Sequence, residues 1–281
     1  MLKGVQQVML GQVCKNEESA KAALHRVKAA GFEGVELNRF MLHELPWAIR
    51  LMTRLAGMPM GGGGKFDLPA LVKAEGLTVI SLHTDLGTLE SKTQEVLEEA
   101  RALGTDRIVM TGMYHYDYSD EASVSDLIRR VNEMGRQLAK QGYRFHYHNH
   151  NCEFLRDASG RLAYERIIEE TAPEAVFFEF DSYWAAECGA DALYWMERLG
   201  ERMKLYHIND RGSRGKGKTG SILKSNALEL GTGAMNLPAL LEKAQNLGCE
   251  AVILETHQNW VDKDPLKSIE ISGEYLCRQL T

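Results

Sequence analysis

The 281-residue sequence has no apolar run approaching the roughly 20 residues that a membrane-spanning helix needs. Its first 14 residues are interrupted by Lys3 and by three glutamines, unlike the continuous apolar core of a secretory signal peptide. We therefore predict a cytoplasmic protein that does not associate with a membrane.

Cysteine is scarce, and its pattern lacks the pairs that disulfide frameworks and zinc ribbons need. The cysteines are Cys14, Cys152, Cys188, Cys249 and Cys277. Their number is odd, they are dispersed, and no two of them form a Cys-x-x-Cys motif. We predict reduced thiols that behave as small apolar residues.

The chain also lacks an excess of positive charge. It has 33 Lys and Arg residues against 39 Asp and Glu residues, which gives a formal net charge of −6 and a pI near 5.9. Non-specific binding to nucleic acid depends on a basic surface field. This balance argues against nucleic acid as a partner.

What the chain does have is a regular alternation of strand and helix patterns. The predicted strands are Val5–Val13, Gly34–Asn38, Thr78–His83, Asp106–Gly112, Tyr143–His150, Ala175–Asp181, Met203–Asn209 and Ala251–His257. The predicted helices are Asn16–Ala30, Leu86–Leu103, Asp120–Gln141, Asp191–Leu199, Leu237–Leu247 and Pro265–Leu280. Eight units of about 35 residues are typical of an α/β fold, the (β/α)8 TIM barrel. We predict one such domain over residues 1–281, with no linker.

Three predicted loops after strands are longer than a minimal connection, so a barrel would place them around its active-site mouth. The first of these loops, Arg39–Gly76, contains a predicted helix at Leu45–Leu55 and four consecutive glycines at 61–64. The glycines are interpreted either as a hinge beside the substrate or as a surface turn. The second loop, Phe154–Ala163, is predicted to form a small hairpin.

The third long loop, Arg211–Asn226, holds the one dense basic segment of the sequence, beginning with Arg211. Arginine and glycine-rich backbone suit anions, so this loop could clamp a phosphate or a carboxylate. The alternative is a solvated surface loop, as is usual for runs of charge.

Four of the predicted strands end at or near a side chain of the metal-binding type: His148, Asp181, His207 and Glu255. The carboxyl ends of parallel barrel strands meet at one face, so we expect these side chains to form one cluster. Imidazole and carboxylate ligands suit Mn²⁺, Mg²⁺, Co²⁺, Fe²⁺ or Zn²⁺. Such an ion could polarise a carbonyl and stabilise the enediolate formed when a neighbouring C–H proton is removed. A helix-capping Asp or a core His is the alternative explanation for each residue alone.

Six motifs occur in order along the chain: GFEGVEL (31–37), YHNHNCEF (147–154), FEFDSYWAAECGAD (178–191), LYHIND (205–210), GTGAMNLPALL (231–241) and VILETH (252–257). Together they resemble the sugar phosphate isomerase/epimerase family with its xylose isomerase-like TIM barrel. The resemblance implies a Glu, Asp, His and Glu metal centre at the ends of strands five to eight. Asp181, His207 and Glu255 match its last three ligands.

The first ligand of that centre departs from the ketose 3-epimerase branch of the family. In place of a glutamate, strand five carries His146, His148 and His150 on one face, with Glu153 shortly after, as in HNH-type members. The strand-end position favours His148 as the ligand, with His150 or Glu153 as alternatives. His146, deeper in the strand, is predicted to be a core or supporting histidine.

These residues predict chemistry with one base. Glu255 or Glu153 would remove a proton next to a carbonyl, and His150 or His83 would act as the acid that returns it or protonates a leaving group. The predicted activity is a metal-dependent isomerase or epimerase of a sugar, sugar phosphate or keto-sugar. Predicted substrate contacts are Glu36, His83, His115, Trp184, Asp210 and Arg211.

Other functions compete with this prediction. A lyase or dehydratase of a keto-sugar or keto-inositol would use the same enolate and expel a leaving group. The apurinic endonucleases of this superfamily need a histidine three residues after the strand-six aspartate, where this chain has Trp184. A barrel that has become a non-catalytic binding protein would be expected to lose metal-binding residues. Asp181, His207 and Glu255 are all present. Assembly into a homo-oligomer is left open.

Overall fold

The computed structural model describes residues 1–44, 61–62, 64–112, 116–214 and 223–280. Contacts within the chain group it into two compact units. Unit 1 comprises Met1–Thr78, Ile208–Leu241 and Val252–Thr281, and unit 2 comprises Val79–His207 with Glu242–Ala251. The predictions made for Leu45–Leu55 and His115 lie outside the described residues.

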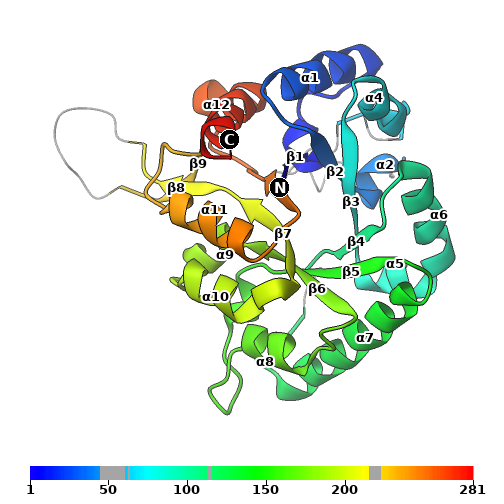
Figure 1. Ribbon diagram of the computed structural model, residues 1–281, viewed down its shortest axis with the longest axis vertical. Helices are drawn as coiled ribbons and strands as arrows, with labels where there is room; N and C mark the ends of the chain where they lie inside the picture. Colours follow the sequence, from blue (N-terminus) through cyan, green and yellow to red (C-terminus); the bar gives the residue numbers. More distant parts are fainter. Residues whose placement is uncertain (45–60, 63, 113–115, 215–222, 281) are drawn as a thin grey trace. The chain divides into compact units, whose positions relative to one another are not determined.

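Eight parallel strands form a closed barrel in the order β1-β10-β7-β6-β5-β4-β3-β2 (Figure 1). These strands are β1 (Leu2–Gln6), β2 (Gly34–Asn38), β3 (Thr78–Thr84), β4 (Arg107–Met110), β5 (Arg144–His148), β6 (Val176–Asp181), β7 (Met203–Ile208) and β10 (Ala251–Leu254). A separate antiparallel pair joins β8 (Asp210–Gly212) to β9 (Asn226–Leu228). The predicted (β/α)8 barrel is confirmed.

Helices alternate with the barrel strands along the chain (Figure 1). The α-helices are α1 (Glu17–Ala29), α2 (Arg39–Leu42), α4 (Leu68–Ala74), α5 (Leu86–Ser91), α6 (Thr93–Leu103), α7 (Glu121–Ala139), α8 (Ala163–Glu170), α9 (Ser182–Glu187), α10 (Ala192–Leu199), α11 (Leu237–Asn246) and α12 (Pro265–Gln279). Short 3-10 helices are η1 (Gln7–Leu10), η2 (Cys152–Phe154), η3 (Gly200–Arg202) and η4 (Val261–Lys263). Within the described residues, no helix is long and apolar enough to cross a membrane.

Most predicted elements differ from the structure by one to three residues at an end, and two differ more. The predicted strand Val5–Val13 is wrong after Gln6, whose side-chain oxygen accepts a hydrogen bond from the Val8 amide at 2.9 Å and starts η1. The predicted helix Leu86–Leu103 is divided at Lys92, which has non-helical φ and ψ of −134° and 32°. Ser91 and Thr93 hydroxyls donate to carbonyls four residues earlier, a local alternative to a continuous helix.

The loop predictions have mixed outcomes. The hairpin predicted within Phe154–Ala163 is present, because Arg156 and Leu162 form an antiparallel bridge. Helix α8, which follows directly, was missed, as were α4, α9 and the β8–β9 pair. Glycines Gly61 and Gly64 have φ of +58° and +76°, the left-handed region in which glycine is favoured.

Strand register in unit 2 separates the apolar core from a polar face. His148 pairs with Glu179 across β5 and β6, and Asp181 pairs with His207 across β6 and β7. The alternate residues, such as Phe178 and Phe180, pack against the Tyr164 ring of α8 at centroid distances of 6.3 and 6.5 Å. Because side chains alternate along a strand, one face buries aromatic rings and the other collects imidazoles and carboxylates.

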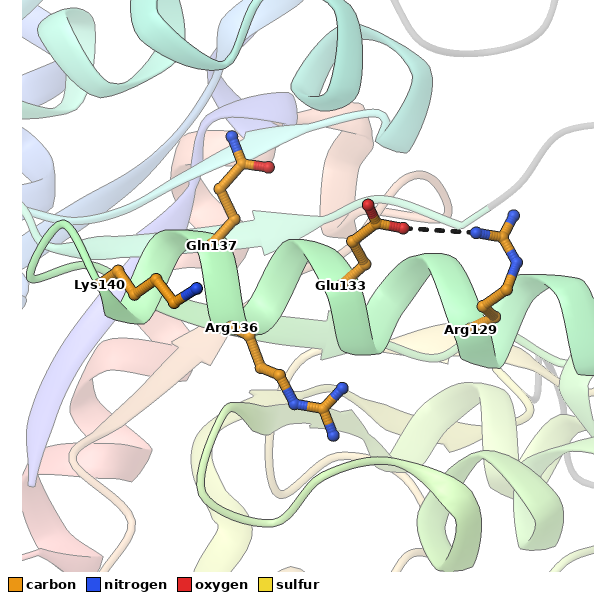
Figure 2. A pocket seen from close by; sticks show the side chains of 5 residues that line it. All are labelled: Arg129, Glu133, Arg136, Gln137 and Lys140. Carbon is orange, nitrogen blue, oxygen red and sulfur yellow. Dashed lines mark hydrogen bonds and ion pairs between the residues drawn. The ribbon is translucent and has the colours of Figure 1, made fainter.

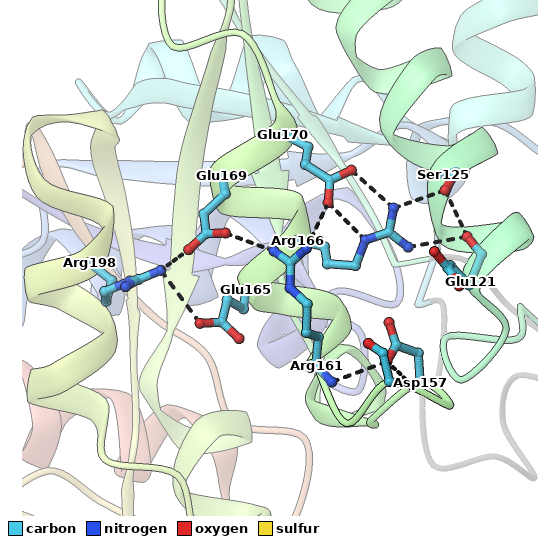
Figure 3. Close-up of polar contacts among 10 residues, drawn as sticks. Glu121, Ser125, Asp157, Arg161, Glu165, Arg166, Glu169, Glu170 and Arg198 are labelled. Carbon is cyan, nitrogen blue, oxygen red and sulfur yellow. Dashed lines mark hydrogen bonds and ion pairs between the residues drawn. The ribbon is translucent and has the colours of Figure 1, made fainter.

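Hydrogen bonds join α7 to α8, and an ion pair joins α8 to α10 (Figure 3). Arg166 is buried and donates to Glu170 at 2.8 Å, to the Ser125 hydroxyl at 2.9 Å and to the Glu121 carbonyl at 3.2 Å. On the same helix, Glu169 accepts hydrogen bonds from Arg161 and from Arg198 of α10. These contacts hold α8 between its two neighbours.

Candidate metal centre

Three of the predicted ligands gather on the polar face of β5, β6 and β7. Within unit 2, potential ligand atoms of His148, Asp181 and His207 lie within 4.8 Å of one another, and all three residues are buried. The register described above brings them together, because paired residues on neighbouring parallel strands project to the same side.

Glu179 is the residue of this cluster that the sequence analysis missed. Its Oε2 atom lies 2.9 Å from His83 Nε2, 3.1 Å from His148 Nδ1 and 3.3 Å from His207 Nε2. The side chain is fully buried. The signal in the sequence was the alternation Phe177, Glu179, Asp181, which places the glutamate on the same strand face as the predicted ligand.

The two imidazoles face this carboxylate with different ring nitrogens. Since His207 turns Nε2 toward Glu179, its Nδ1 atom lies on the other side of the ring, 3.8 Å from Asp181 Oδ2. For His148 the nitrogen next to Glu179 is Nδ1, which leaves Nε2 as the outward nitrogen. A carboxylate behind a metal-binding histidine commonly sets the tautomer in this way. The donor set of buried imidazoles and carboxylates fits a divalent cation.

Asp181 caps a helix with one carboxylate oxygen and keeps the other within the cluster. Its Oδ1 atom accepts hydrogen bonds from the amides of Tyr183 at 2.8 Å and Trp184 at 3.1 Å, and so caps α9. The Oδ2 atom faces His207. Asn149 holds the backbone of Asp181 through two hydrogen bonds of 3.0 and 3.1 Å, which explains the asparagine between the two histidines of the HNH segment.

Glu153 is fully buried beneath that segment. Its Oε1 atom accepts a hydrogen bond from the Tyr147 hydroxyl at 3.1 Å, and Oε2 accepts one from the His150 amide at 2.8 Å. Tyr147 in turn lies 3.3 Å from the Tyr118 hydroxyl. These contacts favour a supporting role for Glu153 over the roles of ligand or base.

The other two histidines of strand five differ in environment. The His150 ring is 4.8 Å from the His148 ring and 5.7 Å from Trp184, and the residue is only partly buried. His146 is fully buried against Phe177, and burial with the nearby Arg144 and Arg107 lowers its pKa to about 3. It is therefore a neutral core histidine, as its depth in the strand predicts.

The remaining described candidates belong to unit 1. Glu36 is buried, and the Gln6 amide donates to it at 3.2 Å. The buried carboxylate of Asp210 accepts hydrogen bonds from the amides of Arg211, Gly231, Gly233 and Met235, which makes it an organiser of the loop after β9. Glu255 is buried directly after β10, with Oε1 3.6 Å from His257 Nε2.

The basic loop is partly anchored within unit 1. Arg214 forms an ion pair with the buried Glu229 and donates to the Asn259 carbonyl at 2.9 Å. Although burial raises the pKa of Glu229, hydrogen bonds from Ser268 and Arg214 outweigh it and hold the pKa below its usual value. The start of this loop is therefore not simply a solvated run of charge.

A surface pocket lies apart from these residues, along the outer side of α7 (Figure 2). Its lining residues are Arg129, Glu133, Arg136, Gln137 and Lys140. Arg129 pairs with Glu133 at 3.3 Å and with Asp126 at 2.7 Å. Exposed ion pairs of this kind contribute little to stability, and none of the five lining residues belongs to the cluster of His148, Asp181 and His207.

A family model described as xylose isomerase-like TIM barrel matches residues 24–278. The chain belongs to this family. A search of curated proteins finds no match for this member. The family agrees with the resemblance to sugar phosphate isomerases/epimerases identified from the motifs.

Solved structures share the fold of this xylose isomerase-like barrel. A sugar phosphate isomerase/epimerase from Parabacteroides distasonis is 23% identical, with a TM-score of 0.76 over 98% of this chain and 93% of that chain. A probable 3-DHS dehydratase from Bacillus anthracis is 13% identical, with a TM-score of 0.69 over 99% of each chain. The zinc-bound IOLI protein is 12% identical, with a TM-score of 0.69 over 100% of this chain and 98% of that chain.

Proposed function

We propose that this protein is a divalent-metal-dependent isomerase or epimerase of a sugar, sugar phosphate or keto-sugar. The observation that carries the proposal is the buried cluster of His148, Asp181 and His207 at the ends of β5, β6 and β7, with Glu179 within 3.3 Å of a ring nitrogen of each histidine. Family membership and the similar sugar phosphate isomerase/epimerase support the substrate class. A cytoplasmic location is part of the same proposal.

The ligands in this proposal are His148, Asp181, His207 and Glu255. Glu255 is supported by its place directly after β10, the strand next to β7 in the barrel order, and by its burial. A bound divalent cation would polarise the substrate carbonyl and stabilise negative charge on the adjacent oxygens. Manganese, magnesium, cobalt, iron and zinc all remain candidates, because mixed nitrogen and oxygen sites discriminate poorly among them.

Proton transfer is assigned to two residues. Glu255 removes the proton from the carbon next to the carbonyl, and His150, partly exposed beside Trp184, returns a proton. Trp184 is suited to the apolar face of a sugar ring. His83 and Asp210 are reassigned from substrate contacts to support, because their described partners are Glu179 and backbone amides.

The test is incubation of the metal-loaded protein with ketoses, sugar phosphates and 3-keto-sugars in D₂O, followed by NMR and mass spectrometry. We expect deuterium at a carbon next to the carbonyl in a product of unchanged formula. Full activity after exhaustive chelation would reject metal dependence. Absence of carbon-bound exchange across the panel at full metal occupancy would overturn the proposal.

A lyase is the second candidate, and the similar 3-DHS dehydratase favours it. Abstraction of the same proton would then be followed by departure of a β-substituent, with His150 protonating the leaving oxygen. Loss of water or of a glycosidic substituent in the same assay would transfer the assignment to this class.

A further inference from the structure

The imidazole of His150 packs directly against a glycine. A Cβ atom placed on Gly112 would lie 2.5 Å from His150 Nδ1 and 2.8 Å from Cε1, closer than real Cβ atoms approach a neighbour. Gly112 follows β4, whose extension is held by a hydrogen bond of 3.0 Å from the Thr111 amide to the Thr84 carbonyl. The ring would therefore have to move to accommodate any side chain at position 112.

Backbone geometry does not require this glycine. The φ angle of Gly112 lies outside the left-handed region, so an alanine could adopt the same backbone without strain. What distinguishes the position is the close approach of the ring.

The backbone of His150 is fixed from below as well. Its amide donates to Glu153 at 2.8 Å, and the other oxygen of this buried carboxylate accepts from Tyr147, which adjoins Tyr118. The ring is bounded by Gly112 on its Nδ1 side and by the rings of His148 and Trp184. With its backbone tethered, the imidazole can give way only by rotating about its side-chain bonds.

We propose that Gly112 is a positioning residue that determines where the His150 imidazole stands, with Glu153 fixing the backbone beneath it. The packed ring turns its Nδ1 corner into the protein and leaves Nε2, across the ring, as the nitrogen for proton transfer. The effect of Gly112 on catalysis rests on the proposed function. The placement of the ring by Gly112 does not depend on it.

The test compares Gly112→Ala with Gly87→Ala, a matched control in α5. A Cβ at Gly87 would have its nearest contact at 3.4 Å from Asp85 Oδ1, an ordinary distance, and its φ is not left-handed. Histidine ring signals are recorded by ¹H–¹⁵N NMR without substrate, with His150 assigned through His150→Ala. We expect the His150 signals to shift in Gly112→Ala and to stay unchanged in Gly87→Ala, with metal content and Tm retained in both.

The kinetic arm uses a substrate of the D₂O panel that the wild type turns over. Displacement of a reacting group by about 1 Å can cost about 100-fold in rate, so we expect Gly112→Ala to lower kcat by about 10- to 100-fold with little change in KM. In a His150→Ala background the same substitution should cause no further loss, since its effect passes through the ring.

Two results would overturn the inference: His150 signals that match the wild type in Gly112→Ala, or an undiminished loss of kcat in the His150→Ala background. Failure of the proposed function is a separate result, because it would appear as a wild type that exchanges no carbon-bound proton. In that case a shift of the His150 signals in Gly112→Ala would still establish that Gly112 places the ring. Unchanged His150 signals would reject that placement.

Discussion

At the scale of single residues, the Glu179 carboxylate of unit 2 lies where three histidines meet. One oxygen lies within 3.3 Å of nitrogens from three histidines, two of them proposed ligands. A fully buried carboxylate is costly unless its partners compensate for lost hydration. Glu179 therefore ties the orientation of His148 and His207 to a group that is not itself in the predicted ligand set.

Glu179→Gln should weaken the binding of Mn²⁺ or Zn²⁺ by about 10- to 100-fold, the usual effect of removing a carboxylate behind a metal-binding histidine. The reason is that the amide no longer enforces the ring tautomers. Isothermal titration calorimetry measures the affinity, and Glu133→Gln on the exposed face of α7 is the control. Wild-type affinity in Glu179→Gln would contradict the orienting role.

Glu255→Gln and His207→Ala should each lose most of the bound metal and nearly all activity, because both are proposed as ligands and Glu255 also as the base. Elemental analysis of the purified variants and the D₂O exchange assay give the two readouts. Retention of full metal content by both variants would remove them from the ligand set.

At the scale of elements, α8 combines a buried apolar face with long side chains that reach both neighbouring helices. Arg166 reaches Ser125 and the Glu121 carbonyl on α7 while it pairs with Glu170 on its own helix. The neighbouring Glu169 connects α8 to Arg198 on α10. A helix of eight residues is marginal alone, so these links and the burial of Tyr164 and Ile167 stabilise it.

Arg166→Ala should lower the free energy of unfolding by about 1 kcal/mol, because the buried Arg166 side chain loses its packing and its hydrogen bonds to Ser125 and to the Glu121 carbonyl. Urea unfolding followed by circular dichroism measures the change. Arg129→Ala, in an exposed ion pair on α7, is expected to change stability little. Equal effects of the two substitutions would show that burial does not govern this network.

At the scale of the whole molecule, charged residues at the amino ends of β4 and β5 pair with Glu250, which precedes β10, and all of these residues belong to unit 2. Arg144 donates to Asp106 at 2.9 Å and to Glu250 at 2.6 Å, and Arg107 donates to Glu250 at 2.5 Å. Burial raises the pKa of Glu250 and Asp106, but the arginines outweigh it and hold both pKa values below their usual range.

Stability should therefore fall in acid. A carboxyl group with a lowered pKa in the folded state stabilises the protein above its unfolded pKa, about 4.3 for Glu, and this contribution disappears as the pH falls through the folded pKa. Urea unfolding between pH 7 and pH 3 should show this loss. Glu250→Gln should be less stable at pH 7 and show a shallower decline below pH 5. If stability falls as steeply with pH in Glu250→Gln as in the wild type, other carboxyl groups cause the acid sensitivity.

Metal should stabilise the native state as a whole. An ion that binds only the folded protein contributes about 2.7 kcal/mol at a concentration 100 times its Kd. Adding Mn²⁺ or Zn²⁺ to metal-free protein should raise the Tm of the wild type but not of His207→Ala. An equal increase in both would indicate binding outside the proposed centre.

The sequence determined the features that depend on local pattern. Apolar runs of strand length predicted the eight barrel strands, and the residues at the ends of these runs identified His148, Asp181 and His207 before any contact was known. Periodicity and strand ends are properties of a short stretch of chain, so they can be predicted without its neighbours.

Only the tertiary structure decided which groups meet. Glu179 looks like any buried strand residue until three histidines from three other strands converge on it, and Gly112 looks like a loop glycine until His150 packs against its missing Cβ. Lys92 divides a helix and Gln6 ends a strand through hydrogen bonds that apolar periodicity does not register. The physical reason is that strand register and close packing join residues distant in the sequence, and the energies of those contacts exist only once the chain has folded.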